Sequence, residues 1–272
     1  MKIHPTAIVD PGARLAEDVE IGPYVCIGGE VALGARTIVR SHAVIEGAVR
    51  IGAENVIGQG AIIGGWPQDL SFKSETRSGI EIGARNVIRE HATIHRGTAA
   101  DSWTRIGDDN FLMAGAHIGH NCAIGNKVII ANNCLLGGCV TVNDGAFLGG
   151  GCVFHQFMRV GRLAITQGNS GFGRDIPPFV IAAGVNKIVG LNVVGLRRAG
   201  FSAEDRAQIK AAFLLLYERG LNVSQALAKA REQTWAGPAQ EFFDFVASAK
   251  RRGICALRRR RATEDAEGNL TG

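Results

Sequence analysis

The sequence predicts a mainly β protein: a parallel β-helix followed by a helical region. Three observations predict it. An aliphatic residue recurs at every sixth position, a small residue stands two positions before it, and helical signals replace this period near the C-terminus. Six is a multiple of the strand period of two and not of the helical 3.6, so the recurring residue and the small one share an inward face. Three such hexapeptides would close one triangular coil of about eighteen residues.

The repeat occupies most of the first two thirds of the chain. Its aliphatic residues stay in phase over positions 3–63, 82–94 and 106–172, and Thr166 breaks the series. A glycine often follows the aliphatic residue, which suits a turn at the end of each hexapeptide. Each coil buries its apolar side only against the next coil, so the stack has to be long, and the chain allows about nine or ten coils.

Two segments interrupt the repeat. The first, about 66–79, is polar, and the second covers about 95–105. A loop of this kind has to leave the coil at a corner, and long loops on a rigid scaffold commonly carry function. We expect a β-helical domain over 1–189, a C-terminal helical domain over 190–257 and a disordered tail over 258–272.

Signals near the C-terminus end the repeat and begin helices. Adjacent prolines cannot donate ladder hydrogen bonds, so Asp175-Ile-Pro-Pro-Phe is expected to end the β-helix. Helices are predicted over 202–220, where a serine cap and a closing glycine bound the segment, and over 223–233. A third is predicted over 238–252, where a proline takes the first helical position.

The excess of positive charge lies at the C-terminal end. The net charge is +5; residues 1–195 hold 16 basic and 16 acidic side chains, and residues 196–272 hold 14 and 9. A basic end on a neutral scaffold suits an acidic partner, either nucleic acid or an acidic protein. No nucleic-acid recognition motif accompanies these residues, which favours the protein.

The composition favours the cytoplasm. There is no stretch of 18 uninterrupted apolar residues, so no transmembrane helix is expected. The repeat begins at Ile3, which leaves no room for a signal peptide. Cys134 and Cys152 should stack one coil apart, within disulfide range, but a cytoplasmic protein keeps such cysteines as thiols.

The eighteen-residue coil also suggests where chemistry could occur, because residues eighteen positions apart form a column. His120 then has Gly138 one coil on and Gln156 one coil beyond that. An outward imidazole near a glycine amide suits a general base beside an oxyanion donor. Four histidines near the insertions fall outside the inward phase: His95, His117, His120 and His155.

Two other interpretations of these histidines are open. Ordinary surface histidines without function would give the same pattern. A metal site needs two or three converging imidazoles, but His117 and His120 are three positions apart on an extended segment and should diverge. We therefore expect no metal here.

Six motifs occur in order along the chain: Pro-Gln-Asp-Leu (67–70), Ile-His-Arg-Gly-Thr (94–98), Ala-His-Ile-Gly-His-Asn-Cys (116–122), His-Gln-Phe (155–157), Pro-Pro-Phe-Val-Ile (177–181) and Gly-Leu-Asn-Val-Val-Gly-Leu-Arg-Arg (190–198). Together they resemble the acyl-[acyl-carrier-protein]–UDP-N-acetylglucosamine O-acyltransferases, the first enzymes of lipid A biosynthesis. The resemblance covers about 1–260. The hexapeptides alone would indicate only the wider superfamily of hexapeptide-repeat transferases.

The resemblance implies a left-handed parallel β-helix with a C-terminal helical domain, assembled as a homotrimer with sites between adjacent subunits. It implies transfer of a 3-hydroxyacyl chain from acyl carrier protein to the 3-hydroxyl of UDP-N-acetylglucosamine. No metal, cofactor or covalent intermediate is implied. Acyl carrier protein, which is acidic, would be the partner of the basic C-terminal helices.

The resemblance also implies roles for single residues. His120 would be the general base and the backbone N–H of Gly138 the oxyanion donor. Gly168 would set the acyl length and, being a glycine, leave room for a long chain. The other substrate contacts would be Asp69 for the sugar, His95, His117, His155 and Gln156 along the cleft, and Asn192 and Arg198 at the nucleotide end.

Five positions depart from the family pattern: Ser71 for a lysine, Asn121 for an aspartate, Cys139 for a histidine, Val194 for a glutamate and Ala199 for an arginine. Asn121 would leave His120 without an orienting carboxylate. The departures keep open the same chemistry on a 3-amino or other nucleotide sugar. Three further alternatives are a coenzyme A-dependent acetyl- or succinyltransferase, a zinc enzyme similar to the γ-class carbonic anhydrases, and a scaffold that binds acidic partners.

Overall fold

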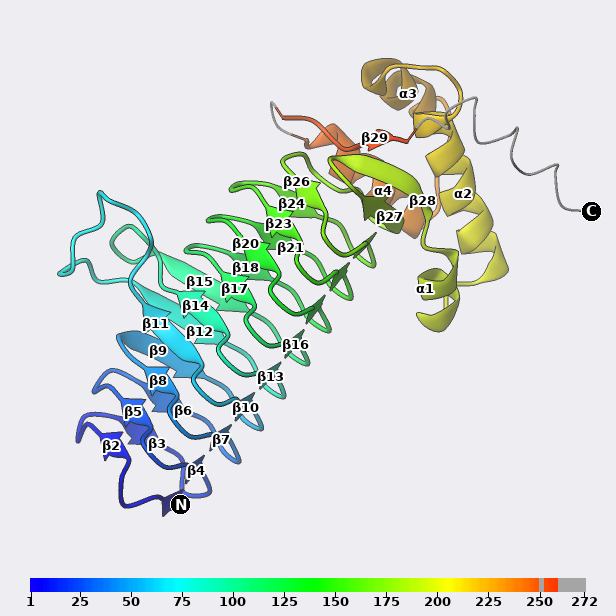
Figure 1. The fold of residues 1–272 in the computed structure, drawn as a ribbon. Coiled ribbons are helices and arrows are strands. Elements are labelled where there is room, and N and C mark those ends of the chain that lie inside the picture. The colour runs from blue at the N-terminus through cyan, green and yellow to red at the C-terminus, as the bar shows by residue number, and fades with distance from the viewer. Residues whose placement is uncertain (250–251, 259–272) are drawn as a thin grey trace, which may run out of the picture.

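The computed structural model describes residues 1–249 and 252–258. The chain winds into a left-handed parallel β-helix with the helices gathered at its C-terminal end (Figure 1). Within the described residues, the strands form three sheets, named A, B and C below. Residues eighteen positions apart are paired wherever no insertion intervenes, as for Ile118 and Leu136. The predicted fold class is confirmed.

Sheet A runs the full length of the coil and carries three extra strands at its C-terminal end. It contains β1 (Lys2–Ile3), β4 (Glu20–Ile21), β7 (Ile38–Val39), β10 (Val56–Ile57), β13 (Val87–Ile88), β16 (Phe111–Leu112), β19 (Ile129–Ile130), β22 (Phe147–Leu148), β25 (Ile165–Thr166), β27 (Val180–Ala183), β28 (Lys187–Leu191) and β29 (Ala256–Leu257).

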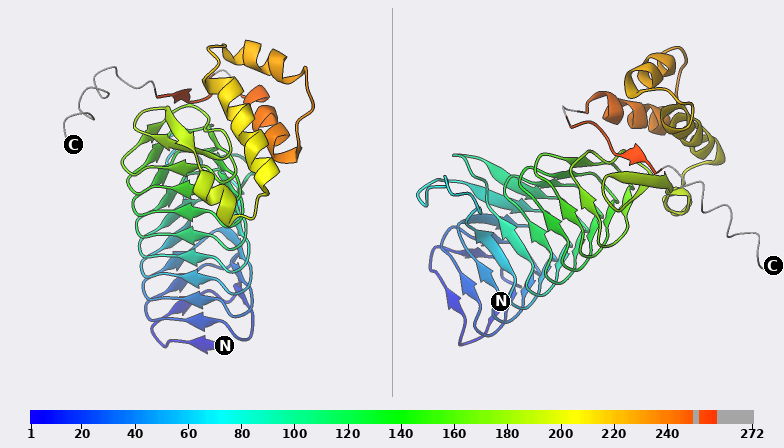
Figure 2. Two further views of the ribbon diagram at one scale, coloured as in Figure 1. Left: turned by 90° about the vertical axis from the view of Figure 1, so that its right-hand side faces the viewer. Right: turned by 45° about the horizontal axis from the view of Figure 1, so that its top comes forward.

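The other two sheets complete the triangle, and the left view of Figure 2 shows the coils stacked along the axis. Sheet B contains β2 (Ile8–Val9), β5 (Cys26–Ile27), β8 (Val44–Ile45), β11 (Ile62–Gly65), β14 (Thr93–His95), β17 (His117–Ile118), β20 (Leu135–Leu136), β23 (Val153–Phe154) and β26 (Gly171–Phe172). Sheet C contains β3 (Arg14–Leu15), β6 (Ala32–Leu33), β9 (Ala48–Ile51), β12 (Gly79–Ile82), β15 (Trp103–Ile106), β18 (Ala123–Ile124), β21 (Thr141–Val142) and β24 (Arg159–Val160).

The core is a column of the recurring aliphatic residues, with the small residues beside them. Ile45, Ile63 and Leu136 are fully buried, and so are Cys134 and Cys152. The last two are free thiols although they lie one coil apart. Burial of this apolar column stabilises the fold, because each coil shields the faces of its neighbours from water.

The outward faces of the sheets differ in chemistry. On sheet C they are mostly charged or small, with Arg14, Arg50, Glu81, Arg105 and Arg159 among them. On sheet A they are apolar and half-buried in the central coils: Ile38, Val56, Val87, Phe111, Ile129, Phe147 and Ile165. Sheet B also exposes large apolar side chains, namely Ile8, Ile62, Leu135 and Val153. Sheets A and B therefore present apolar rows outward, and sheet C does not.

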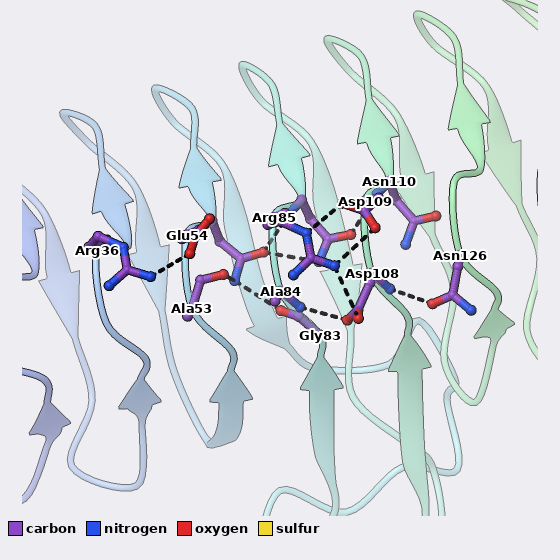
Figure 3. A network of polar contacts seen from close by, with 12 residues as sticks. Arg36, Ala53, Glu54, Gly83, Ala84, Arg85, Asp108, Asp109, Asn110 and Asn126 are labelled. Atoms are coloured by element: carbon purple, nitrogen blue, oxygen red, sulfur yellow. Dashed lines mark hydrogen bonds and ion pairs between the residues drawn. The ribbon is translucent and has the colours of Figure 1, made fainter.

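The corner between sheets C and A is held by polar side chains stacked from coil to coil (Figure 3). Arg36 pairs with Glu54, and Arg85 with Asp109 at 2.7 Å. The backbone N–H of Ala84 donates to Oδ1 of Asp108 at 2.8 Å. At this corner, side chains therefore accept hydrogen bonds from backbone N–H groups that have no partner in the strand ladder.

The eighteen-residue spacing ends at the predicted stretch 175–179, but sheet A continues beyond it. Thr166 pairs with Ala182, sixteen positions on instead of eighteen, so the last coil is two residues shorter. Pro178 lies in the turn of this last coil and packs against Gly161. A Cβ added to Gly161 would lie 2.3 Å from the proline nitrogen. A proline in this turn removes no ladder hydrogen bond. Thr166 also fits the core, since its Oγ1 accepts from the Gly149 N–H at 2.9 Å.

Two strands then close the C-terminal end of the coil. β28 pairs antiparallel with β27, and β29 returns from the far end of the chain to pair with β28. Neither strand was predicted. This pairing covers the last coil, which a stack of repeats needs because its end otherwise exposes the core.

Four helices follow within the described residues: α1 (Val193–Arg198), α2 (Ala203–Tyr217), α3 (Val223–Ala230) and α4 (Gly237–Ala247). The predicted serine cap of α2 is confirmed, because Ser202 forms a capping box with Asp205. The three predicted helices are each three to five residues shorter than expected at the C-terminal end, and α1 was not predicted. No helix in 1–249 or 252–258 is long and apolar enough to span a membrane. The predicted tail lies outside the described residues except for Arg258.

Two arginines of the last coils fix α4 to the β-helix. Arg159 forms an ion pair with Asp175 at 2.7 Å and donates to the Phe245 carbonyl at 3.1 Å. Arg162 binds Glu241 through two guanidinium nitrogens, the shorter contact being 2.6 Å. Paired contacts of this kind set the orientation of the helices because the guanidinium fork is planar and rigid.

Candidate active site

The corner between sheets B and C carries both long excursions of the chain. The loop 66–78 leaves β11 and enters β12, and the segment 96–102 joins β14 to β15. β11 ends in a bulge at Gly64, whose φ is +99° and where a Cβ would lie 1.7 Å from the Glu46 carbonyl oxygen. Only glycine fits there, so the backbone can turn outward into the loop.

His120 lies on this corner against the main chain of Gly138. A Cβ added to Gly138 would lie 2.2 Å from Cε1 and 2.3 Å from Nε2 of the imidazole. His120 is half-buried and points away from the core. The predicted neighbourhood of these two residues is therefore present, and the absence of a side chain at Gly138 makes room for the ring.

The N–H of Gly138 has no acceptor among the described residues. At the C–A corner, the equivalent N–H groups donate hydrogen bonds to side chains, as those of Ala84 and Asp108 do (Figure 3). A buried or half-buried N–H without a partner is unusual in a folded chain. The B–C corner thus presents an open main-chain donor beside an imidazole.

Asn121 fixes which nitrogen of the neutral His120 ring carries the hydrogen. Its Oδ1 lies 2.9 Å from Nδ1 of His120 and 3.1 Å from both the N–H and the hydroxyl of Thr98. Because a backbone N–H can only donate, the atom facing Thr98 has to be the amide oxygen. Nδ1 of His120 is then the protonated nitrogen, and Nε2 carries the lone pair that a general base needs.

The backbone of Asn121 is anchored as well. Its N–H donates to the buried hydroxyl of Thr104 at 2.8 Å, and its φ is +60°, which asparagine tolerates. As expected from Asn121, no carboxylate lies on Nδ1 of His120; the neutral amide oxygen of Asn121 orients the ring instead. The contact of Asn121 with Thr98 could not be predicted from the repeat, because Thr98 belongs to an excursion outside it.

His95 and His117 lie beside the base. Their ring centroids are 4.7 Å apart, and Nδ1 of His117 lies 2.7 Å from the Thr93 hydroxyl. Burial, followed by the charges of His117 and His120, lowers the pKa of His95 to about 4. Burial and the charge of His120 lower the pKa of His117. At neutral pH both rings are uncharged and can take part in neutral hydrogen bonds.

Asp69 is exposed in the loop, near enough to His120 for the charge of that ring to act on its carboxyl. Its Oδ1 accepts from the N–H of Ser71 at 2.9 Å and from its hydroxyl at 2.7 Å. These hydrogen bonds lower the pKa of the carboxyl, and the charge of His120 lowers it further. The two hydrogen bonds from Ser71 thus orient the Asp69 carboxylate.

His155 and Gln156 are exposed on the next coil of the same corner. Nδ1 of His155 lies 3.1 Å from the carbonyl of Gln156, and the N–H of Phe157 donates to the Gly138 carbonyl at 2.9 Å.

In residues 1–249 and 252–258, no three His, Cys, Asp or Glu side chains converge as metal ligands.

Three of the predicted site residues do not lie at this corner of the same chain. Gly168 is exposed at the corner between sheets A and B. Asn192 caps α1 and is buried, with Oδ1 accepting from the Gly195 N–H and Nδ2 donating to the Leu163 carbonyl, both at 2.8 Å. Arg198 ends the same helix, and Figure 1 shows α1 well away from the 66–78 loop.

Comparison with known proteins agrees with this architecture. A family model described as UDP N-acetylglucosamine O-acyltransferase, domain 2, matches residues 175–255, and one for six hexapeptide repeats of bacterial transferases matches 104–138. A protein of Paraburkholderia xenovorans named acyl-[acyl-carrier-protein]–UDP-N-acetylglucosamine O-acyltransferase is 49% identical, over 93% of this chain and 98% of its own. The Thermodesulfovibrio yellowstonii protein of the same name is 44% identical, over 93% and 99%.

Solved structures extend the similarity to the whole fold. The UDP-N-acetylglucosamine acyltransferase of Francisella novicida has a TM-score of 0.89 and 35% identity, and 99% of each chain is covered. The Arabidopsis enzyme has a TM-score of 0.81 and 30% identity, over 93% of this chain and 99% of its own. The sequence matches span nearly all of both chains, and the structures share the coil and the C-terminal helices. This chain therefore belongs to the family of acyl-[acyl-carrier-protein]–UDP-N-acetylglucosamine O-acyltransferases.

Proposed function

We propose that this chain transfers a 3-hydroxyacyl group from acyl carrier protein to the 3-hydroxyl of UDP-N-acetylglucosamine, the first step of lipid A biosynthesis. The name shared by its relatives supports the reaction. The observation that carries the mechanism is the contact between the unprotonated Nε2 of His120 and the main chain of Gly138, whose N–H is open.

His120 acts as the general base. Nε2 takes the proton of the sugar hydroxyl as its oxygen attacks the thioester carbonyl, and the imidazolium that forms keeps its Nδ1 hydrogen bond to Asn121. A carbon–oxygen bond forms, the carbon–sulfur bond breaks, and the imidazolium returns the proton to the departing thiolate of the carrier. The histidine thus ends each cycle neutral.

The N–H of Gly138 stabilises the oxyanion. Negative charge develops on the carbonyl oxygen in the tetrahedral intermediate, and a fixed main-chain donor next to the base suits this charge without reorganisation. The adjacent rings of His95 and His117 are neutral at physiological pH, so they line the cleft without competing for the proton. They would contact the substrates together with His155 and Gln156.

Asp69 binds the sugar. Its ionised carboxylate lies near the base in the 66–78 loop and can accept hydrogen bonds from sugar hydroxyls. Asn192 and Arg198 bind the nucleotide end, where the guanidinium suits a diphosphate. In Asn192 the side-chain Oδ1 caps α1 and Nδ2 binds the Leu163 carbonyl, so this residue acts at the nucleotide end by holding α1, and with it Arg198, against the β-helix.

A homotrimer completes the site. Gly168 lies at the A–B corner and His120 at the B–C corner, so one chain cannot bring them together. A neighbouring copy can bring its Gly168 to this His120 if its A–B corner meets the B–C corner of the first chain. Contacts between different surfaces of identical chains close into rings when the rotation between neighbours allows it. The apolar outward rows of sheets A and B support this contact. Gly168 then lies beside the acyl chain and leaves room for a long one.

Acyl carrier protein docks on the basic C-terminal region. Residues 196–272 carry 14 basic and 9 acidic side chains, and an acidic carrier is attracted by this excess. We place the reaction in the cytoplasm.

The test is a transfer assay with purified protein, UDP-N-acetylglucosamine and 3-hydroxyacyl carrier proteins of several chain lengths. The mass of the product gives the acyl length, and its hydroxylamine lability distinguishes an ester from an amide. We expect an ester with a long chain. Transfer only to the 3-amino sugar, or from acetyl- or succinyl-coenzyme A instead of the carrier protein, would contradict the proposal.

A further inference from the structure

We infer that Arg96 is a positioning residue that holds the 66–78 loop over the base, so that Asp69 meets the sugar beside His120. The inference rests on the proposed sugar-binding role of Asp69. Arg96 follows β14 at the B–C corner, at the start of the second excursion, and its side chain extends toward the first.

Arg96 contacts the middle of the loop in two ways. Its Nη2 donates to the carbonyl of Ser74 at 3.1 Å, and its guanidinium carbon lies 5.2 Å from the centroid of the Phe72 ring. Phe72 in turn packs on Trp66, with ring centroids 6.4 Å apart. One arginine thus joins the coil to three residues of the loop through a charged hydrogen bond and a cation–π contact.

Packing, more than hydrogen bonding, decides where the guanidinium lies. Nε is fully buried and has no acceptor among the described residues. A Cβ added to Gly47 would lie 3.4 Å from Nη1, so the fork reaches the main chain two coils before Arg96. A buried donor without an acceptor is unfavourable. Arg96 is therefore held under the loop by its contact with the Phe72 ring together with the hydrogen bond to Ser74, a combination that a lysine, which lacks the guanidinium fork, does not reproduce.

The position of Phe72 determines that of Asp69. The two residues are the ends of one turn, in which the Phe72 N–H donates to the Asp69 carbonyl at 3.0 Å. The side chain of Asp69 closes the same turn through the N–H of Ser71. An arginine that fixes Phe72 therefore fixes the direction of the Asp69 carboxylate relative to His120.

The experiment compares Arg96→Met and Arg96→Lys with the unchanged protein. Amide hydrogen exchange without substrate should be faster over 66–78 in both variants. The KM for UDP-N-acetylglucosamine should rise about tenfold, equivalent to about 1.4 kcal/mol. The kcat and the KM for the acyl carrier protein should change less than about threefold, because the base and the oxyanion donor are untouched.

Arg36→Met is the matched control, since Arg36 pairs with Glu54 at the C–A corner, away from the loop. It should leave both readouts unchanged. Phe72→Leu, which removes the ring from the other side of the contact, should reproduce the Arg96 effects even if Arg96→Met fails to fold. Unchanged loop exchange, or a fall in kcat at constant KM, would overturn the inference. The exchange measurement needs no turnover, so it tests the contact separately from the proposed reaction.

Discussion

The imidazole of His120 lies so close to Gly138 that a methyl group at Gly138 would come within 2.3 Å of Nε2. The base and the main-chain donor therefore share one space on neighbouring coils. The imidazole leaves no room for a side chain at position 138, which explains the glycine there. Its backbone angles do not require glycine, since the φ of Gly138 is not positive.

Gly138→Ala should consequently lower kcat about a hundredfold, because the ring of His120 is displaced from its position beside the oxyanion donor. The melting temperature should stay within a few degrees of the original, about the effect of 1 kcal/mol or less. Gly237→Ala is the control, since a Cβ at Gly237 meets nothing within 4 Å. An active Gly138→Ala enzyme would show that the ring works from elsewhere.

Asn121 should control the pH profile of kcat/KM. Asn121→Leu removes the acceptor that fixes the tautomer of His120, so turnover should fall by about one to two orders of magnitude. Asn121→Asp keeps the acceptor and adds a negative charge that stabilises the imidazolium. The acid limb of its profile should move to higher pH. Equal profiles for the asparagine and aspartate enzymes would contradict an orienting contact through Oδ1.

The sequence period predicted the coil because a hexapeptide is a local rule that each repeat obeys by itself. It placed His120 beside Gly138 for the same reason. It could not place Asn121, whose role depends on Thr98 in a non-repeating segment. The strands β28 and β29 were missed because their pairing joins segments far apart in the chain. The roles assigned to Gly168, Asn192 and Arg198 remain predictions, since they need a second copy of the chain.

The lowered pKa of His95 should make the folded protein less stable in mild acid than at neutral pH. This pKa is about 4 in the folded protein, against 6.5 for an exposed histidine, chiefly because burial disfavours the charged ring. Below pH 6.5 the unfolded chain therefore binds a proton that the folded chain refuses, and stability falls as the pH drops toward 4. The melting temperature of His95→Gln should decline less between pH 7 and pH 4.5 than that of the unchanged protein. Parallel declines would contradict the depressed pKa.

Arg159 should be important for the attachment of α4. Asp175, whose side chain is 8% exposed, would be left as an unpaired buried charge in Arg159→Met, which should cost up to about 3 kcal/mol in the free energy of unfolding. Arg36→Met breaks an exposed pair and should cost less than about 1 kcal/mol. Urea unfolding followed by circular dichroism measures both. Equal losses in the two variants would show that the buried pair contributes no more than a surface pair.

The most direct test of the mechanism is the kcat of His120→Ala at saturating UDP-N-acetylglucosamine and acyl carrier protein. Removal of the base should lower kcat by about a hundredfold to ten-thousandfold, while sedimentation and melting temperature stay those of the unchanged protein. A His120→Ala enzyme that turns over at close to the original rate would contradict the assignment of the base.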